Sequence, residues 1–220
     1  MLNRIFNPEN GIWKLMGVLV DVLAFSLLWL LCAVTLVGLG PGTTALYDAM
    51  ARHLGKGELG GYVRFWDSLK ANFKVGCPAG LAVVALGYGL VKLHGALYAA
   101  AATGDKLMFA LYIAYWVCFV VICGIVAYIF PVLSRFTFGV GGLLANSVKL
   151  AFAHPLTTLL LGLLTGGCIL LCIIYWLPGL VLPYVWAWLA SLLLERVFKP
   201  FMEEQGEVES AAPELNDEEE

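Results

Sequence analysis

The sequence predicts an all-α fold: a bundle of about five membrane-spanning helices with amphipathic helices on its cytoplasmic side. Three observations predict it. Of the 220 residues, 61% are hydrophobic and 13% are charged, whereas soluble domains carry about 25% charged residues. Several apolar runs are long enough to cross a bilayer, which takes about 20 residues. The basic residues gather in the connections between these runs. Lipid is therefore the expected solvent.

The apolar runs define the expected crossings. The first begins at Met16, and its 23 residues would extend about 33 Å as a helix, enough to span the hydrocarbon core. This run is too long for the core of a cleaved signal peptide. Residues 1–15 are expected to lie in the membrane interface. The expected transmembrane domain covers residues 16–201, with helices at 16–38, 77–102, 107–130, 155–176 and 178–194.

The connection between the first two runs is the most polar part of the body. Gly40-Pro41-Gly42 is expected to end the first helix, and Thr43-Thr44 to cap a second one. Between Tyr62 and Phe73, apolar residues recur every three or four positions, as on one face of a helix. This amphipathic helix would lie on the membrane surface or pack on the protein's own core, and the sequence leaves both open.

The C-terminal end differs from the rest of the chain. Residues 203–220 contain nine acidic residues and no Lys or Arg. Such a composition is typical of disorder, so residues 202–220 are expected to form a disordered acidic tail. The remaining body carries 13 basic and seven acidic residues, a net charge of +6. A basic body fits a cytoplasmic face beside anionic lipid.

The distribution of Lys and Arg predicts the orientation. With five crossings and the N-terminus outside, nine basic residues face the cytoplasm and four face outward. The positive-inside rule favours this arrangement, which makes the C-terminus cytoplasmic. The alternative places the N-terminus inside and dips residues 39–54 back into the membrane.

A short motif recurs in the two halves of the chain. Residues 68–73 and 147–152 both read S-[LV]-K-x-x-F, and each leads from a polar connection into an apolar run. Each is also preceded by a run that ends with a proline. The sequence therefore suggests a parallel internal repeat, a feature of some transporters.

No motif predicts catalysis. The sequence lacks the phosphate-binding loop of NTPases, the serine-nucleophile elbow and the HExxH zinc motif. We expect no enzymatic activity, no cofactor, no metal and no nucleic-acid partner. The six cysteines lie in or at the ends of apolar runs without a C-x-x-C pair, so they are expected to be buried small residues rather than a disulfide framework.

A few polar residues could carry function. Asp21 is a carboxylate within the first apolar run, which marks a functional candidate, although it could instead be an interfacial partner of Lys14 or Arg4. Arg135 follows the third run, where it could bind lipid phosphate or pair with Asp48 or Asp67. The candidate polar or interface positions are Asp21, Lys70, Arg135 and Lys149.

Two glycines in the fourth run are candidates for close helix packing. Gly162 and Gly166 form a G-x-x-x-G motif, which lets helix backbones approach each other in a membrane. The motif can pack helices within one chain or between two chains, and the sequence is compatible with both.

Several segments together resemble the YesL-type bacterial membrane proteins, over about residues 3–196. The matching segments are Phe6-Asn7-Pro8-Glu9-Asn10, Gly40-Pro41-Gly42-Thr43-Thr44-Ala45-Leu46-Tyr47, residues 65–74, residues 130–136 and residues 146–155. The resemblance implies a multi-pass protein of the bacterial cell membrane, in contact with membrane lipids. That family has no established biochemical function. Its genes often neighbour those for carbohydrate uptake, which implies an accessory role beside a sugar ABC transporter, and the resemblance transfers no catalytic residues.

Three functions therefore remain in view. The first is a non-enzymatic accessory or scaffold protein for carbohydrate uptake by an ABC transporter. The second is a small-solute transporter or channel, which would require a polar cavity near the membrane midplane. The third, with the least support, is a membrane enzyme acting on lipid or glycan through Arg64, Asp67 and Arg135.

Overall fold

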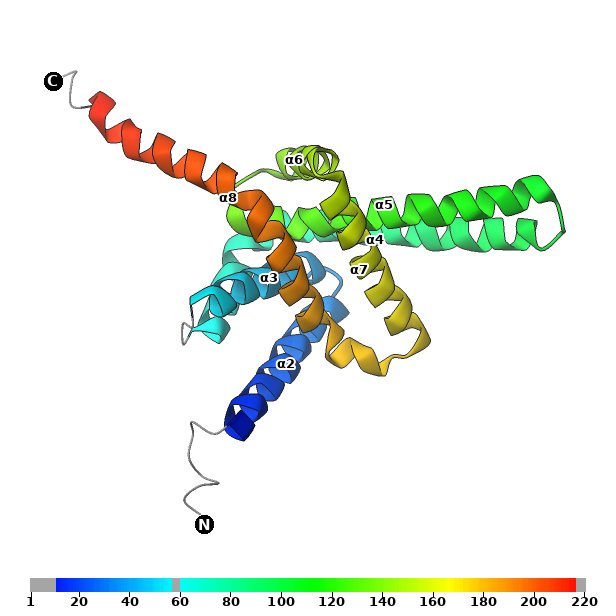
Figure 1. Ribbon diagram of the computed structural model, residues 1–220, viewed down its shortest axis with the longest axis horizontal. Helices are drawn as coiled ribbons and strands as arrows, with labels where there is room; N and C mark the ends of the chain where they lie inside the picture. The colour runs from blue at the N-terminus through cyan, green and yellow to red at the C-terminus, as the bar shows by residue number, and fades with distance from the viewer. Residues whose placement is uncertain (1–10, 57–59, 217–220) are drawn as a thin grey trace, which may run out of the picture.

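The described part of the chain is entirely helical. The computed structural model describes residues 11–56 and 60–216, with side chains over 16–52 and 60–202. Within them lie seven α-helices, one 3-10 helix and no strand (Figure 1), as the composition predicted. The elements are α2 (Gly11–Val34), α3 (Leu39–Lys56), α4 (Gly61–Ala101), α5 (Lys106–Arg135), α6 (Val140–Ala153), α7 (Pro155–Ile174), η1 (Leu177–Leu180) and α8 (Leu182–Asn216).

Four of these helices are long and apolar enough to cross a membrane, which makes the chain a multi-pass membrane protein. They are α2 from Met16, α4, α5 and α7. Four of the five expected apolar runs thus lie in candidate spans. The fifth, 178–194, is divided between η1 and the first turns of α8, because Pro178 and Pro183 interrupt it. By length and apolar character, α8 is not among the candidates.

The first expected crossing ends earlier than its composition indicated. Residues 16–38 were expected to form one helix, but α2 stops at Val34. Leu36 adopts a positive φ of 55°, a left-handed conformation incompatible with a continuing helix. The hydroxyl of Thr35 accepts a hydrogen bond from the Gly38 N–H at 3.0 Å and so closes the turn.

Helix α3 begins inside the segment that was expected to be a loop. It starts at Leu39, so Gly40-Pro41-Gly42 forms its first turn. Proline is tolerated there because the first backbone N–H groups of a helix have no intrahelical acceptor. The expected cap is wrong: the hydroxyls of Thr43 and Thr44 donate to the carbonyls of Leu39 and Gly40 instead. Residues 40–50 are all buried, and α3 packs against α2, α4, α5 and α8 at the centre of the molecule.

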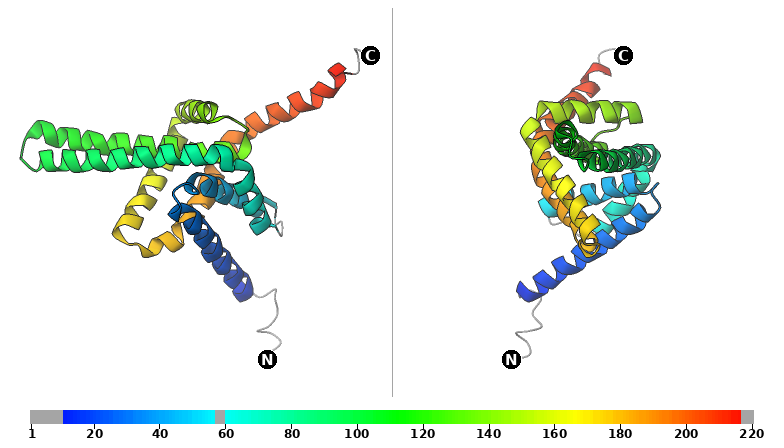
Figure 2. Two further views of the ribbon diagram at one scale, coloured as in Figure 1. Left: turned by 180° about the vertical axis from the view of Figure 1, so that it is seen from behind. Right: turned by 90° about the vertical axis from the view of Figure 1, so that its right-hand side faces the viewer.

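The expected surface helix and the second crossing are one element. Helix α4 runs unbroken for 41 residues, with Pro78 inside it. Figure 2 shows its first turns changing direction before the long straight part, as proline produces by removing an intrahelical hydrogen bond. In those first turns Phe65 and Ser68 are buried while Trp66 and Phe73 are exposed. The expected separate helix is therefore the start of α4. One side of it, with Phe65 and Ser68, packs on the protein's own core, whereas Val63, Trp66 and Phe73 of the predicted apolar face are exposed.

Glycines let the helices touch backbone to backbone at two crossings. Between α3 and α4, a Cβ on Gly40 would overlap the carbonyl oxygen of Gly76, and one on Gly80 would lie 2.7 Å from the Gly40 nitrogen. Between α5 and α7, a Cβ on Gly162 would overlap the carbonyl oxygen of Val120. Such contacts need residues without side chains.

Beyond these crossings, α4 and α5 continue as an arm. The arm, defined here as residues 81–118, is an antiparallel helix pair that extends away from the other helices (Figures 1 and 2). It ends in a turn at Gly104, whose φ is +83°, and the Asp105 side chain caps α5 by accepting the Leu107 N–H at 3.0 Å. Its large exposed apolar side chains are Leu81, Leu86, Tyr88, Val91, Leu93, Tyr98, Leu107, Phe109, Leu111, Ile113 and Val117.

The C-terminal segment differs from the expected disordered tail. Helix α8 continues to Asn216, so most of residues 202–220 is helical, and residues 217–220 lie outside the described part. Glu and Gln are favourable helix residues, and an existing helix extends without a new nucleation step. At the other end, residues 1–10 of the expected interfacial segment also lie outside the described part.

The two copies of the S-[LV]-K-x-x-F motif face the protein in the same way. Ser68 and Ser147 are buried, whereas Lys70 and Lys149 are exposed. The surroundings differ, because the first copy lies within α4 and the second ends α6 just before the break at His154. The internal repeat stays a prediction.

Candidate functional site: a buried charge cluster

A carboxylate at the centre of the molecule gathers three arginines from three helices. Asp48 lies in α3 and is 3% exposed. Its Oδ1 accepts the Arg52 Nε at 2.8 Å, one turn further along α3, and its Oδ2 accepts the Arg64 Nε at 3.0 Å from the start of α4. Nη1 of Arg135, in the last turn of α5, lies 3.6 Å from Oδ1.

Arg135 links this carboxylate to a second one on α8. Its side chain is 7% exposed. Its Nε and Nη2 donate to Oε1 of Glu195 at 3.0 and 2.6 Å. The Tyr47 hydroxyl donates to the same oxygen at 3.1 Å. Tyr47, Asp48, Arg52, Arg64, Arg135 and Glu195 together form what we call the charge cluster.

The charge cluster joins α3, α4, α5 and α8. An isolated buried charge costs several kcal/mol, and a paired one is tolerated only with good geometry and further hydrogen bonds. Arg135 meets this condition through two carboxylates. Burial raises the pKa of the Tyr47 phenol well above its usual range, Glu195 and Asp48 raise it further, and Arg135 lowers it. The phenol therefore stays neutral and serves as a donor to Glu195.

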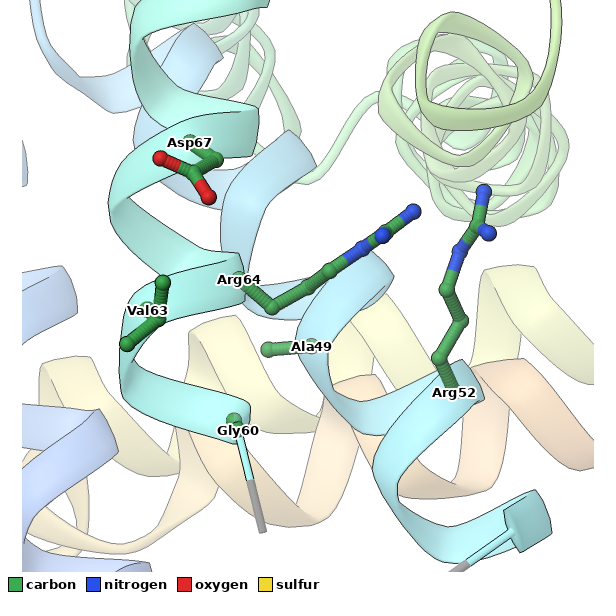
Figure 3. A pocket seen from close by; sticks show the side chains of 7 residues that line it. Ala49, Arg52, Gly60, Val63, Arg64 and Asp67 are labelled. Atoms are coloured by element: carbon green, nitrogen blue, oxygen red, sulfur yellow. The ribbon is translucent and has the colours of Figure 1, made fainter. Parts of the chain in front are cut away.

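A pocket opens beside the charge cluster between α3 and the start of α4. Its volume is about 230 Å³. Figure 3 shows the side chains of Arg52 and Arg64 reaching the same side of it, with Asp67 about one turn further along α4. The lining residues are Ala49, Arg52, Gly60, Gly61, Val63, Arg64 and Asp67.

Comparison with known proteins finds a distant relative over nearly the whole chain and a partial match to a family model. It is 26% identical over 215 residues to the "Uncharacterized protein YesL" of Bacillus subtilis (strain 168), a match that covers 94% of this chain and 99% of that protein. The chain is a distant homologue of YesL. The model of the family described as "Protein of unknown function, DUF624" matches residues 22–91. No solved structure matches the chain.

The resemblance to YesL expected from sequence motifs is thus confirmed over nearly the whole chain. The segment matched by the DUF624 model contains Asp48, Arg52 and Arg64 of the charge cluster. Arg135 and Glu195 lie beyond that segment. Neither comparison brings a biochemical activity, because both descriptions state that the function is unknown or uncharacterised.

The polar residues predicted from sequence do not lie together in the structure. Arg135 lies in the charge cluster and pairs with Asp48, not with Asp67. Its guanidinium is buried between carboxylates, which leaves it poorly placed for the lipid phosphate that was the other expectation. Asp21 accepts a hydrogen bond from the Tyr62 hydroxyl at 2.8 Å. Lys70 and Lys149 are exposed and contribute nothing to the cluster.

The two predicted packing glycines lie on the face of α7 that meets α5. Gly162 is at the crossing with Val120, and a Cβ on Gly166 would lie 3.4 Å from the Phe119 ring. The motif therefore packs helices within this chain. Of the three residues that the membrane-enzyme hypothesis combined, Arg64 and Asp67 line the pocket, whereas Arg135 is not among its lining residues.

Sequence reasoning missed Glu195, Arg52 and Tyr47. The signal for Glu195 was a carboxylate directly after the apolar residues 182–194, and such a residue calls for a cationic partner. Nothing in the local sequence marked Tyr47 as a residue of the cluster, because a tyrosine in a polar segment is common. Within the described side chains, no group of three or more His, Cys, Asp or Glu is arranged to hold a metal ion.

Proposed function

We propose that this YesL-like chain is a non-enzymatic accessory protein of the bacterial cell membrane, which docks onto the permease of a carbohydrate ABC transporter. The observation that carries the proposal is the arm. It exposes long apolar faces of two helices away from the core, which suits contact with lipid and with another membrane protein. The carbohydrate partner rests on the resemblance described from the sequence.

One face of the arm suits a partner helix. Small residues lie on one side of α4 at steps of three, four, seven and three residues, and Lys92 lies on the same side between the third and fourth of them. In membranes, helices associate where small residues let their backbones approach. All the members of this small-residue face are exposed; they are Ala82, Ala85, Gly89, Ala96 and Ala99.

A bulky residue on that face should abolish docking. Gly89 has no atom within 4 Å of an added Cβ, so Gly89→Leu should fold normally while blocking a partner helix. The tagged protein, expressed at its native level, would be purified in mild detergent and its partners identified by mass spectrometry. We expect the unmodified protein to retain a sugar-transporter permease in near-stoichiometric amount and Gly89→Leu to lose at least about 80% of it, a loss that corresponds to about 2 kcal/mol of weakened binding.

The matched control is Gly95→Leu. Gly95 lies on the same helix, is exposed and likewise has no atom within 4 Å of an added Cβ, but six residues from Gly89 it points to another side of the helix, about 120° away. This variant should retain the partner. Loss of the permease in both variants would contradict docking through the small-residue face, and recovery of the unmodified protein without any permease would contradict the accessory role.

A second candidate is a small-solute transporter or channel. Ionisable residues buried among membrane helices often mark a transport path, and the charge cluster contains Asp48 and Arg135 in that situation. This function gains weight if the protein purifies without partners. Solute flux into liposomes that contain the purified chain would then support it, and flux equal to that of empty liposomes would exclude it for the solutes tried.

We also propose that the first turns of α8 form a fifth crossing. Helix α7 runs antiparallel to α5, since Thr158 meets Gly124 and Gly162 meets Val120. Helix α8 then returns along α7, where the Trp186 Nε1 donates to Thr165 at 2.9 Å, and its Glu195 reaches Arg135 at the end of α5. If α7 crosses the membrane, α8 must bring the chain back to the Arg135 side.

Reporter fusions test this topology. With five crossings, the N- and C-termini lie on opposite sides of the membrane, so a C-terminal green fluorescent protein should fluoresce in the cytoplasm while an N-terminal tag is accessible from outside. Four crossings would place both termini on one side. Accessibility of the N-terminal tag only after the membrane is permeabilised would contradict the five-crossing arrangement.

A further inference from the structure

We propose that the pocket between α3 and α4 binds a phosphate group, supplied by an anionic lipid headgroup or by a soluble phosphate compound. This inference is independent of the transporter partner. The pocket, at about 230 Å³, is smaller than the roughly 300–1,000 Å³ of sites for drug-sized ligands. Its size suits a small anionic group rather than a large organic molecule.

Two arginines supply the donors. Asp48 holds the Nε atoms of Arg52 and Arg64 at 2.8 and 3.0 Å, so one buried carboxylate orients both guanidinium groups. Among the described residues, their terminal Nη atoms have no partner. The two side chains are 43% and 44% exposed and reach the same side of the pocket (Figure 3). Pre-oriented guanidinium forks are the usual protein donors to phosphate oxygens.

The start of α4 adds to this positive potential. Gly60 precedes the helix, lines the pocket and provides no side-chain cap. The first intrahelical acceptor is the Gly60 carbonyl, bonded to the Arg64 N–H at 2.9 Å. The N–H groups before Arg64 therefore have no acceptor within the helix, and the N-terminal end of a long helix favours an anion. This contribution supports the arginines and would not make a site alone.

One carboxylate opposes an anion in the pocket. Asp67 lines it and makes no ion pair with any described residue. Because its charge is exposed and unpaired there, Asp67 can be neutralised without disturbing the charge cluster. Val63, which is 66% exposed and also lines the pocket, can conversely be replaced by glutamate without touching Asp48. These two positions allow the anion affinity to be changed in both directions.

The test is titration calorimetry on the full-length protein in a neutral detergent at about 0.15 M salt, where exposed charges more than about 8 Å apart are largely screened. The probes are inorganic phosphate and dihexanoylphosphatidic acid, a water-soluble lipid. We expect saturable binding of at least one. Asp67→Asn should tighten it about three- to tenfold and Val63→Glu should weaken it at least about tenfold, the size expected for one charge a few ångströms away in a partly solvated site. Binding of the lipid alone assigns the site to the membrane; binding of inorganic phosphate shows that no lipid chain is required.

A matched control removes two cations from the same helix outside the pocket. The double variant Lys70→Gln with Lys74→Gln should keep the affinity within about twofold, because both side chains are exposed and neither lines the pocket. The proposal is overturned if neither probe binds. It is also overturned if binding is unchanged in Asp67→Asn and Val63→Glu, or if it is lost in the lysine variant.

Discussion

Replacing Arg135 with methionine is expected to lower the free energy of unfolding by about 3–5 kcal/mol, the cost of removing one partner from a buried ion pair. The methionine fills a similar volume, so packing changes little. Glu195 would keep only the Tyr47 hydroxyl, and Asp48 would lose the arginine that is nearly as buried as itself. Denaturation by sodium dodecyl sulfate in mixed micelles measures the difference.

The control for this experiment is Arg196→Met. Arg196 is the chain neighbour of Glu195, but it is exposed and makes no ion pair with the described residues. Its loss should change stability by less than about 0.5 kcal/mol. The double variant Arg135→Met with Glu195→Gln should recover part of the loss, since it removes the carboxylate that would otherwise be left without its arginine. Equal stability of Arg135→Met and the unmodified protein would show that the charge cluster does not hold the helices together.

Alanine at Gly40 or Gly162 is expected to destabilise the fold by about 1–3 kcal/mol or more, the usual cost of overpacking. The new Cβ atoms would overlap backbone carbonyl oxygens of Gly76 and Val120, respectively. A flexible side chain could move aside, but a helix backbone can yield only by separating the two helices. The α3–α4 and α5–α7 crossings should therefore open, and the midpoint of thermal unfolding in detergent should fall.

Two other glycines provide controls at which alanine should not destabilise the fold. Gly87 in α4 and Gly167 in α7 have no atom within 4 Å of an added Cβ. Alanine there should be neutral or stabilise by up to about 1 kcal/mol, because alanine is the better helix residue. Similar losses at Gly162 and Gly167 would indicate a general effect of substitution in α7 rather than the close crossing.

Much of the architecture followed from composition and periodicity. Four apolar runs became candidate spans, because about 20 apolar residues suffice to define a membrane helix without reference to the rest of the chain. The helix boundaries were predicted less accurately than the apolar runs. The helix start expected at residue 77 lies inside α4, next to Pro78, and Gly40-Pro41-Gly42, expected to end the first helix, opens α3. Proline forbids one hydrogen bond, and whether a helix continues past it depends on the packing of its neighbours.

Sequence reasoning predicted only some of the residues of the candidate site. Arg135 could be singled out because an arginine beside an apolar run needs a partner, and Asp48 was one of two candidates for it. The second partner, Glu195, lies 60 residues away on α8, and no local pattern connects positions so far apart. The pocket likewise combines Ala49 and Arg52 of α3 with the first turn of α4.

By itself, the sequence determined that this protein is helical, belongs in a membrane and is related to YesL, because hydrophobicity and family motifs are properties of local residues. Only the tertiary structure decided which buried charges neutralise each other, which glycines meet a neighbouring backbone and which arginines reach a pocket. The physical reason is that burial and pairing depend on distances between helices, and those distances arise only when α3, α4, α5 and α8 pack together.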